Sequence, residues 1–352
     1  MIYEFRVLPL QFKNRAIEKF MKANHVKQVE NLSLMRILAA LLLLMLTVGC
    51  SNTSKLEKEI AAIPMTVDID RFDITFSKAT PDQLPVLKQQ YPQFFPRQYN
   101  DSIWLARMSD TLQLALNNAV QAEFPDNTKI EDQLYPLFQH LEYYFPEFES
   151  PQIVTVISDV DYRNKVIASD SLLIIGLDNY LGVDHPLYEG VKRYVVKTLK
   201  PSQIGPDVVK TYSRQLIAIP KNRDFLAQIV YFGKELYLKD ILLPELSDAE
   251  KLGYTEAEYQ WALENESDIW RYFVEKEILY STDPRLPGRF INAAPFSKFY
   301  LEIDNESPGQ IGRFIGWQIV RAYMNNNDTD INSLLSENAS TIFSLSKYKP
   351  AK

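Results

Sequence analysis

The spacing of the apolar residues changes twice along this chain, and that change limits the folds open to it. Apolar residues recur at helical spacing in 101–124 and in most segments after residue 188. Between these regions, 152–158 and 165–178 are rich in β-branched residues and are separated by a polar turn. This order predicts an α+β fold, a mostly helical single domain with a small central β-sheet, and not an alternating βαβ chain.

The expected elements follow from these patterns and from the prolines that interrupt them. A strand or extended segment is expected at 67–76. Helices are expected at 101–124, 128–145 (where Pro136 can break the helix), 188–199, 206–218, 224–243, 255–279 and 310–325.

The chain has one cysteine, Cys50, and an apolar run of 12 residues, 37–48, precedes it. A membrane-spanning helix needs roughly 20 such residues, so the run is too short to cross a bilayer. With Arg36 before it, 35–49 is predicted to be a lipoprotein signal peptide, and Thr47-Val48-Gly49-Cys50 is similar to a bacterial lipobox. Cys50 is therefore expected to carry a diacylglycerol on its sulfur and to become the first residue of the mature protein. The alternative is a buried helix with an incidental cysteine.

The signal peptide divides the chain. Residues 1–34 precede a signal peptide that has its own methionine, so they are expected to be an over-extended start or a disordered leader. A polar tether is expected at 50–63, one globular domain at 64–328 and a C-terminal tail at 329–352.

Charge and cysteine content exclude several classes of function. The first 49 residues contain seven Lys and Arg against three acidic residues, so the remainder has 31 positive and 42 negative side chains. A domain this acidic is a poor partner for nucleic acid, and its charges are expected to be a solvated surface. One cysteine excludes an internal disulfide and zinc sites built on several cysteines.

Residues that could carry chemistry are few. The three histidines, His25, His140 and His185, form no HExxH pair, and no P-loop, GxGxxG or GxSxG is present. The acidic clusters lack the calcium-loop pattern and are expected to be solvated; they are Asp68, Asp70 and Asp73, Asp159 and Asp161, and Glu264, Glu266 and Asp268. Many aromatic residues recur at helical spacing and are expected in the core, with some left to line a groove or an interface; they are Tyr143, Tyr144, Phe145, Tyr231, Phe232, Tyr237, Trp270, Tyr272, Phe273, Trp317 and Tyr323. No catalytic residue, metal site or cofactor is predicted.

Several stretches together resemble the gliding-motility lipoprotein GldB family of Bacteroidetes. They are the lipobox, VDIDRFDITF, YPQFFPRQY, SPQIVTVISDVDY, SLLIIGLDNYLGVDHPLY, DFLAQIVYFGKELYLKDILLP and GQIGRFIGWQIVRAYM. The resemblance implies a lipid-anchored outer-membrane protein that faces the periplasm, works with gliding and its secretion apparatus, and has no assigned enzymatic activity.

A fainter likeness is to gluzincin metallopeptidases, which would make this a degenerate gluzincin-like fold. The helix expected to correspond to their HExxH helix, DVVKTYSRQLIAI, contains no histidine. Phe232 precedes Gly233 where those enzymes have a glutamate, and Glu235 falls two residues past the glycine. All zinc ligands would then be missing, because zinc needs three such donors.

Three functional hypotheses follow. The first is a non-catalytic cell-envelope lipoprotein that acts through protein–protein contacts in gliding and secretion. The second is a hydrolase or peptidase-like enzyme whose catalytic residues the sequence does not identify, or a pseudo-peptidase that binds a peptide as an added strand or in an aromatic cleft. The third is a lipoprotein that binds a small ligand or a glycan in such a cleft.

Overall fold

The computed structural model of the 352-residue chain describes residues 55–169 and 171–351. The chain divides into two units, 1–58 and 59–352. The described residues of the first unit, 55–58, form the start of helix α2 (Lys55–Ala61). The sheet and all helices after α2 belong to the second unit. In the described residues, no helix is both long enough and apolar enough to cross a bilayer.

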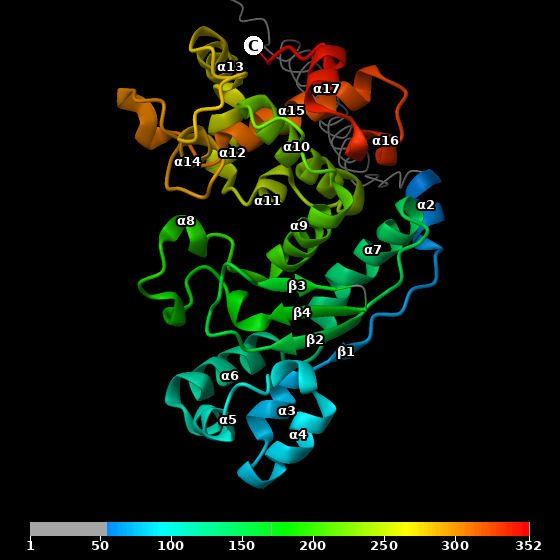
Figure 1. Ribbon diagram of the computed structural model, residues 1–352, viewed down its shortest axis with the longest axis vertical. Coiled ribbons are helices and arrows are strands. Elements are labelled where there is room, and N and C mark those ends of the chain that lie inside the picture. Colours follow the sequence, from blue (N-terminus) through cyan, green and yellow to red (C-terminus); the bar gives the residue numbers. More distant parts are fainter. Residues whose placement is uncertain (1–54, 170, 352) are drawn as a thin grey trace, which may run out of the picture. The chain divides into compact units, whose positions relative to one another are not determined.

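A mixed sheet lies at the centre of the first half of this unit (Figure 1). Its strands are β1 (Ile69–Asp70), β2 (Gln152–Val156), β3 (Val166–Ala168) and β4 (Leu172–Gly176), in the order β1-β2-β4-β3. β1 and β4 are parallel to β2, whereas β3 pairs antiparallel with β4. The expected central strand group is therefore present, with 165–178 folded into the β3–β4 hairpin.

The two faces of the sheet pack against different helices. Side chains alternate between the faces along a strand, so Val154 contacts one apolar cluster and its neighbour Ile153 contacts another. The Val154 face packs against α3 (Phe72–Lys78), α4 (Leu84–Gln90) and α5 (Asp101–Ser109); the Ile153 face packs against α7 (Thr128–Tyr144) and α9 (Ile204–Leu216). Helix α6 (Thr111–Glu123) follows α5 and contacts α3.

The second half is entirely helical. Its elements are α10 (Phe225–Leu242), α11 (Asp248–Leu252), α12 (Glu256–Glu264), α13 (Glu266–Glu275), α14 (Leu286–Phe290), α15 (Ile311–Asn326), α16 (Ile331–Ser336) and α17 (Ala339–Ser346). Helices α10 and α15 form its centre and share a second apolar core with the helices around them (Figure 1). The remaining short helices are α8 (Arg193–Val196) and the 3₁₀ turns η1 (Pro81–Gln83), η2 (Pro92–Phe94), η3 (Leu177–Asn179), η4 (Pro186–Tyr188), η5 (Pro201–Gln203) and η6 (Glu302–Glu306).

The structure confirms the α+β fold and corrects several element boundaries. The strand expected at 67–76 is wrong beyond Asp70, because Phe72 and Phe76, one helical turn apart, are both buried in the core on α3. The helix expected at 101–124 is two helices, since Asp110 is extended and its side chain caps α6 by accepting from the Gln113 N–H. Only 193–196 of the helix expected at 188–199 is α-helical.

Three further segments also differ from the expected boundaries. The helix expected at 255–279 ends at Glu264 and restarts as α13 after Asn265. Helix α7 continues through Pro136, because its apolar face is buried on both sides of the proline. The C-terminal tail predicted at 329–352 contains α16 and α17, which bury Leu334 and Ile342 in the second core.

Candidate functional site

The predicted lipid-attachment residue, Cys50, lies outside the described residues. The signal peptide, residues 50–54 of the tether and the residues before Met35 lie outside them as well, whereas 55–61 of the expected tether form helix α2. The anchor therefore stays a prediction from the sequence.

The two described histidines have local structural roles. His140 is buried on α7, and its Nδ1 lies 2.8 Å from the Pro136 carbonyl oxygen. His185 caps η4, because its Nδ1 accepts a hydrogen bond of 3.3 Å from the Leu187 N–H.

Of the acidic residues of the first strand region, Asp68 is exposed as expected, whereas Asp70 and Asp73 are paired within the protein and are not the solvated strand ends that the sequence predicts. Arg71 holds Asp73 through two hydrogen bonds of 2.9 and 2.8 Å, and the Thr155 hydroxyl donates to the same carboxylate at 2.5 Å. Tyr91 donates to Asp70 at 3.1 Å. Within the described ranges, no group of three His, Cys, Asp or Glu side chains is placed to hold a metal ion.

The other acidic clusters are separated from one another. Asp159 pairs with Arg107 at 2.8 Å, while Asp161 accepts from the Asn164 side chain at 2.9 Å. Glu264 and Asp268 are exposed, whereas Glu266 is buried. Burial raises the pKa of Glu266, although a 2.6 Å hydrogen bond from the Tyr348 hydroxyl opposes that shift.

Carboxylates on the two helices of the gluzincin comparison are paired with cations. On α9, Asp207 forms an ion pair with the buried Lys165 and accepts a 3.0 Å hydrogen bond from the Tyr180 hydroxyl. On α10, Glu235 lies 3.8 Å from the Lys239 Nζ and 4.0 Å from the Arg313 guanidinium. This arrangement disfavours a divalent metal ion, because the negative charge that would attract one is already neutralised.

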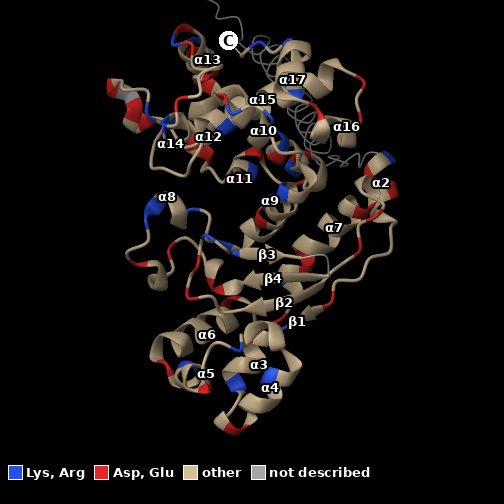
Figure 2. Cartoon of the chain, viewed as in Figure 1, with Lys and Arg blue, Asp and Glu red and all other residues tan. Residues whose placement is uncertain are grey.

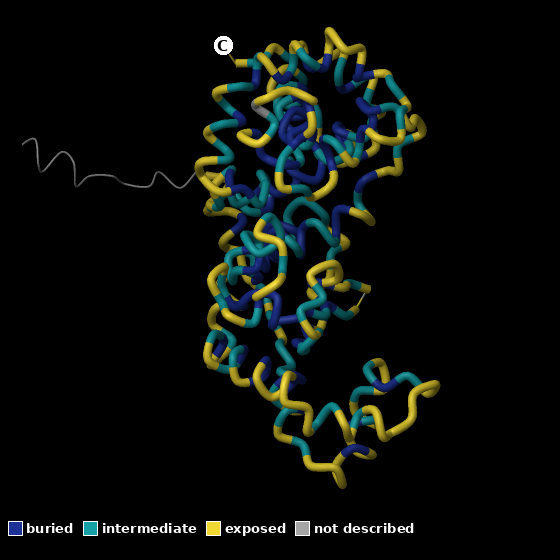
Figure 3. Tube along the Cα trace, turned by 90° about the vertical axis from the view of Figure 1, so that its left-hand side faces the viewer, coloured by how far each residue is buried: buried dark blue, intermediate teal, exposed yellow. Residues whose placement is uncertain are grey.

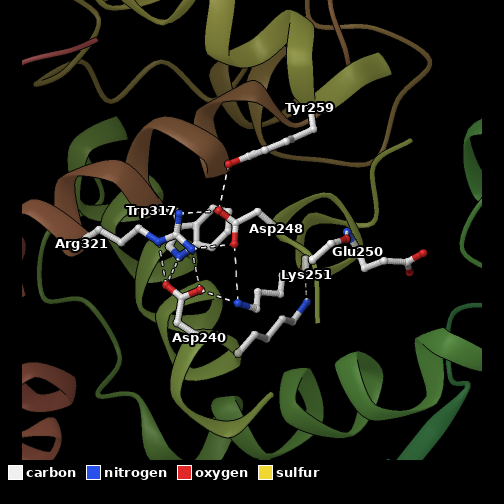
Figure 4. A network of polar contacts seen from close by, with 9 residues as sticks. Asp240, Asp248, Glu250, Lys251, Tyr259, Trp317 and Arg321 are labelled. Carbon is white, nitrogen blue, oxygen red and sulfur yellow. Dashed lines mark hydrogen bonds and ion pairs between the residues drawn. The ribbon is translucent and has the colours of Figure 1, made fainter. Parts of the chain in front are cut away.

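A second charge network joins α10, α11, α12 and α15 (Figure 4). The Arg321 guanidinium donates two hydrogen bonds of 2.7 Å to Asp240 and bonds of 2.7 and 2.9 Å to Asp248. It also stacks on Trp317, whose Nε1 donates to Asp240 at 2.8 Å. Lys251 and the Tyr259 hydroxyl complete the contacts to these two carboxylates. Because every carboxylate is paired, the network acts as a connection between helices and leaves no reactive group free.

The surface of α5 and α6 is unusually apolar. Four large apolar side chains on these helices are 37–54% exposed, and we call them the α5–α6 surface: Ile103, Leu105, Leu112 and Leu114. Glu123 is the only charged residue of α6, which is almost uniformly tan in Figure 2. Figure 3 shows the α3–α6 region, at the bottom of that view, as mostly exposed or half-buried chain.

Other side chains of α5 and α6 line a cavity of about 370 Å³. We call it the aromatic cavity, because rings form much of its wall; the rings belong to Phe72, Phe76, Phe94, Phe95 and Trp104. Val156 of β2 and Ile174 of β4 also line it. Most of the aromatic residues singled out from the sequence pack in or against the first and second cores, as expected, and none of them lines this cavity.

Polar side chains of α6 also line the aromatic cavity, and sequence reasoning missed them. Gln113 and Asn117 are each 4% exposed and occupy the buried stripe of α6 together with Leu116 and Val120. The available signal was their spacing, since amides at i and i+4 interrupt an otherwise apolar stripe.

Comparison with known proteins identifies one family. A family model described as gliding motility protein GldB matches residues 53–350. No curated protein and no solved structure matches the chain. The gluzincin likeness therefore stays a prediction.

Proposed function

Since the chain belongs to the GldB family of gliding motility proteins, we propose that it is a non-catalytic lipoprotein that acts by binding protein partners. Its anchor is the acylated Cys50, and the folded unit faces the periplasm from the outer membrane. The partners belong to the gliding machinery and its associated secretion apparatus.

The α5–α6 surface is the observation that carries this proposal. Ile103 is 48% exposed and Leu112 is 54% exposed, on two consecutive helices. Covering a half-exposed Ile or Leu side chain yields about 1 kcal/mol, so several together give a partner a driving force for association. Clusters of exposed apolar side chains are typical of protein-binding surfaces.

The charged residues of α9 and α10 support the non-catalytic part of the proposal. Asp207 on α9 and Glu235 on α10 each form ion pairs with cations of the protein itself. Zinc bound to the purified protein in a one-to-one ratio would contradict this part.

A pseudo-peptidase that binds a peptide in an aromatic cleft is the second candidate. The aromatic cavity favours it, because ring-lined cavities with a few polar groups are typical ligand sites. This candidate differs from the first in locating recognition inside the fold as well as on its surface.

The test replaces Ile103 and Leu112 together by serine in cells that lack the chromosomal copy. We expect gliding to be lost, while the melting temperature and the membrane-bound fraction stay at wild-type values, because exposed positions contribute little to folding. The matched control is Val274→Ser, which removes a side chain of similar exposure, 49%, from α13 and should leave gliding intact. Normal gliding of the double variant would contradict the proposed surface.

A further inference from the structure

The aromatic cavity contains polar atoms that have no partner. Among the described residues, the Trp104 Nε1, the Gln113 Oε1 and the Asn117 Nδ2 are buried and make no hydrogen bond. All three residues line this one cavity. Leaving a buried donor or acceptor unpaired costs about 1–3 kcal/mol, so a fold that keeps three together is suited to a group that pairs them.

The two amides of α6 define what that group is. The Gln113 Nε2 donates to the Asn117 Oδ1 at 3.1 Å, which leaves one acceptor on Gln113 and one donor on Asn117. If both amides were turned over, the pair would still present one donor and one acceptor. A single donor beside a single acceptor is complementary to the main chain of one extended residue, whose own N–H and C=O point to the same side, whereas the N–H and C=O of one trans peptide unit point in opposite directions.

The remaining lining residues fix the polarity of the ligand. Arg107 is paired with Asp159 at 2.8 Å, and Asp73 is paired with Arg71 at 2.8 Å, so the two charged residues of the lining are already neutralised. The walls are otherwise aromatic and aliphatic, and a charged ligand would lose its hydration there without a counter-charge. The Trp104 indole N–H adds a donor for a second carbonyl oxygen.

We propose that the aromatic cavity binds one apolar residue of a partner polypeptide, with its side chain against the rings and its own main-chain N–H and C=O on Gln113 and Asn117. The volume, about 370 Å³, lies at the lower end of the range for ligand sites, about 300–1,000 Å³. The choice of a polypeptide rests on the proposed function and on one observation: α5 and α6 line the cavity and also present the exposed α5–α6 surface. A polypeptide anchored in the cavity can cover those side chains, whereas a free small molecule would leave them in water.

The experiment is isothermal titration calorimetry of the full chain in lipid nanodiscs, with empty nanodiscs subtracted. The probes are N-acetyl-L-phenylalanine N-methylamide and its ester analogue O-acetyl-L-3-phenyllactic acid N-methylamide, in which an oxygen atom replaces the phenylalanine N–H. We expect the amide to bind at least tenfold more tightly, because the ester leaves a buried acceptor unpaired. Equal dissociation constants, or no binding of either probe, would overturn the proposal without any variant.

Two variants test whether Gln113 and Asn117 cause the difference between the two dissociation constants. Gln113→Met combined with Asn117→Leu keeps the side-chain size and removes both polar partners, so the ratio of the two dissociation constants should fall to about one. Gln318→Met is the matched control, since the Gln318 Nε2 is also buried and unpaired but the residue does not line this cavity. A control that loses the discrimination, or a double variant that keeps it, would contradict the assignment.

A longer probe tests whether the bound residue can belong to a polypeptide chain. N-acetyl-Ala-Phe-Ala N-methylamide should bind at least as tightly as the short amide if the chain can leave the cavity in both directions. Loss of binding would overturn the polypeptide source. Neither result depends on gliding, so failure here is distinguishable from failure of the Ile103 and Leu112 test.

Discussion

Lys239 shows how far a buried residue of this protein departs from its behaviour in water. Its Nζ donates to the Lys251 carbonyl oxygen at 2.8 Å and lies 3.8 Å from Glu235. Burial lowers the pKa of Lys239 to about 8, against the opposing effect of the Glu235 carboxylate. Asp207 also favours the charged form, whereas Lys210 and Arg313 disfavour it.

This depressed pKa predicts a dependence of stability on pH. Between a folded pKa of about 8 and an unfolded pKa of about 10.4, the unfolded chain binds more protons than the folded one, so stability due to Lys239 rises with pH. From pH 7 to 9.5, wild type should gain about 1–2 kcal/mol of unfolding free energy relative to Lys239→Met. Urea unfolding at both pH values measures this difference. Lys276→Met, at an exposed position, should reproduce the wild-type pH profile; parallel profiles for wild type and Lys239→Met would refute the assignment.

At single residues, the local signal-peptide pattern predicts the role of Cys50, and that role stays a prediction. Asp73 was expected to be solvated and is instead buried and paired with Arg71, because the packing of α3 removes it from water. Gln113 and Asn117 were not predictable as cavity residues, because polar side chains on a helix are usually exposed and only the packing of α6 buries them.

At the scale of elements, the closest contact of the helical half is between α10 and α15. A Cβ at Gly316 would lie 1.8 Å from the Ile229 carbonyl oxygen, and a Cβ at Gly233 would lie 2.3 Å from the Gly316 carbonyl oxygen. Backbone therefore meets backbone at this crossing, and only glycine fits on either side.

We expect Gly316→Ala to separate α10 from α15 and to lower the unfolding free energy by about 3 kcal/mol or more, as other overpacked cores do. Gly288→Ala is the matched control, because no atom lies within 4 Å of its added Cβ. Thermal and urea unfolding compare the two variants. Similar stability of both would show that the crossing adapts to the methyl group.

Element type was predictable where one apolar period runs over many residues, as in α10 and α15. The predicted boundaries of helices and strands were wrong where tertiary contacts determine them. The segment 67–76 alternates like a strand, yet α3 forms because Phe72 and Phe76 contact the core on one side. Asp110 and Asn265 each end one helix and start the next within a continuous apolar pattern.

At the scale of the whole molecule, the α+β class could be predicted from the order in which helical and strand-like spacing of apolar residues occurs along the chain. The strand order β1-β2-β4-β3 could not be predicted from that spacing. Strand order depends on which side of β2 each later strand packs, and that is decided by helices far away in sequence. The proposed attachment to the membrane also belongs to this scale, since it concerns where the folded unit is held.

Cys50→Ala should release the protein from the membrane fraction or leave its signal peptide uncleaved. Each buried CH₂ of an acyl chain contributes about 0.8 kcal/mol, so two or three chains hold a protein permanently. Fractionation of cells followed by immunoblotting measures the effect, and Ser51→Ala is the matched control. Unchanged membrane association of Cys50→Ala would refute lipidation.

The Lys234 contacts have a consequence for how the chain matures. Its buried Nζ donates to the carbonyl oxygens of Leu335 and Glu337, which lie 101 and 103 residues later in the sequence. Helix α10 therefore lacks the acceptors for this cation until α16 has been synthesised. A growing chain cannot complete the second core early, and contacts this distant also slow its closure. The second core therefore closes only after the C-terminal helices have been synthesised.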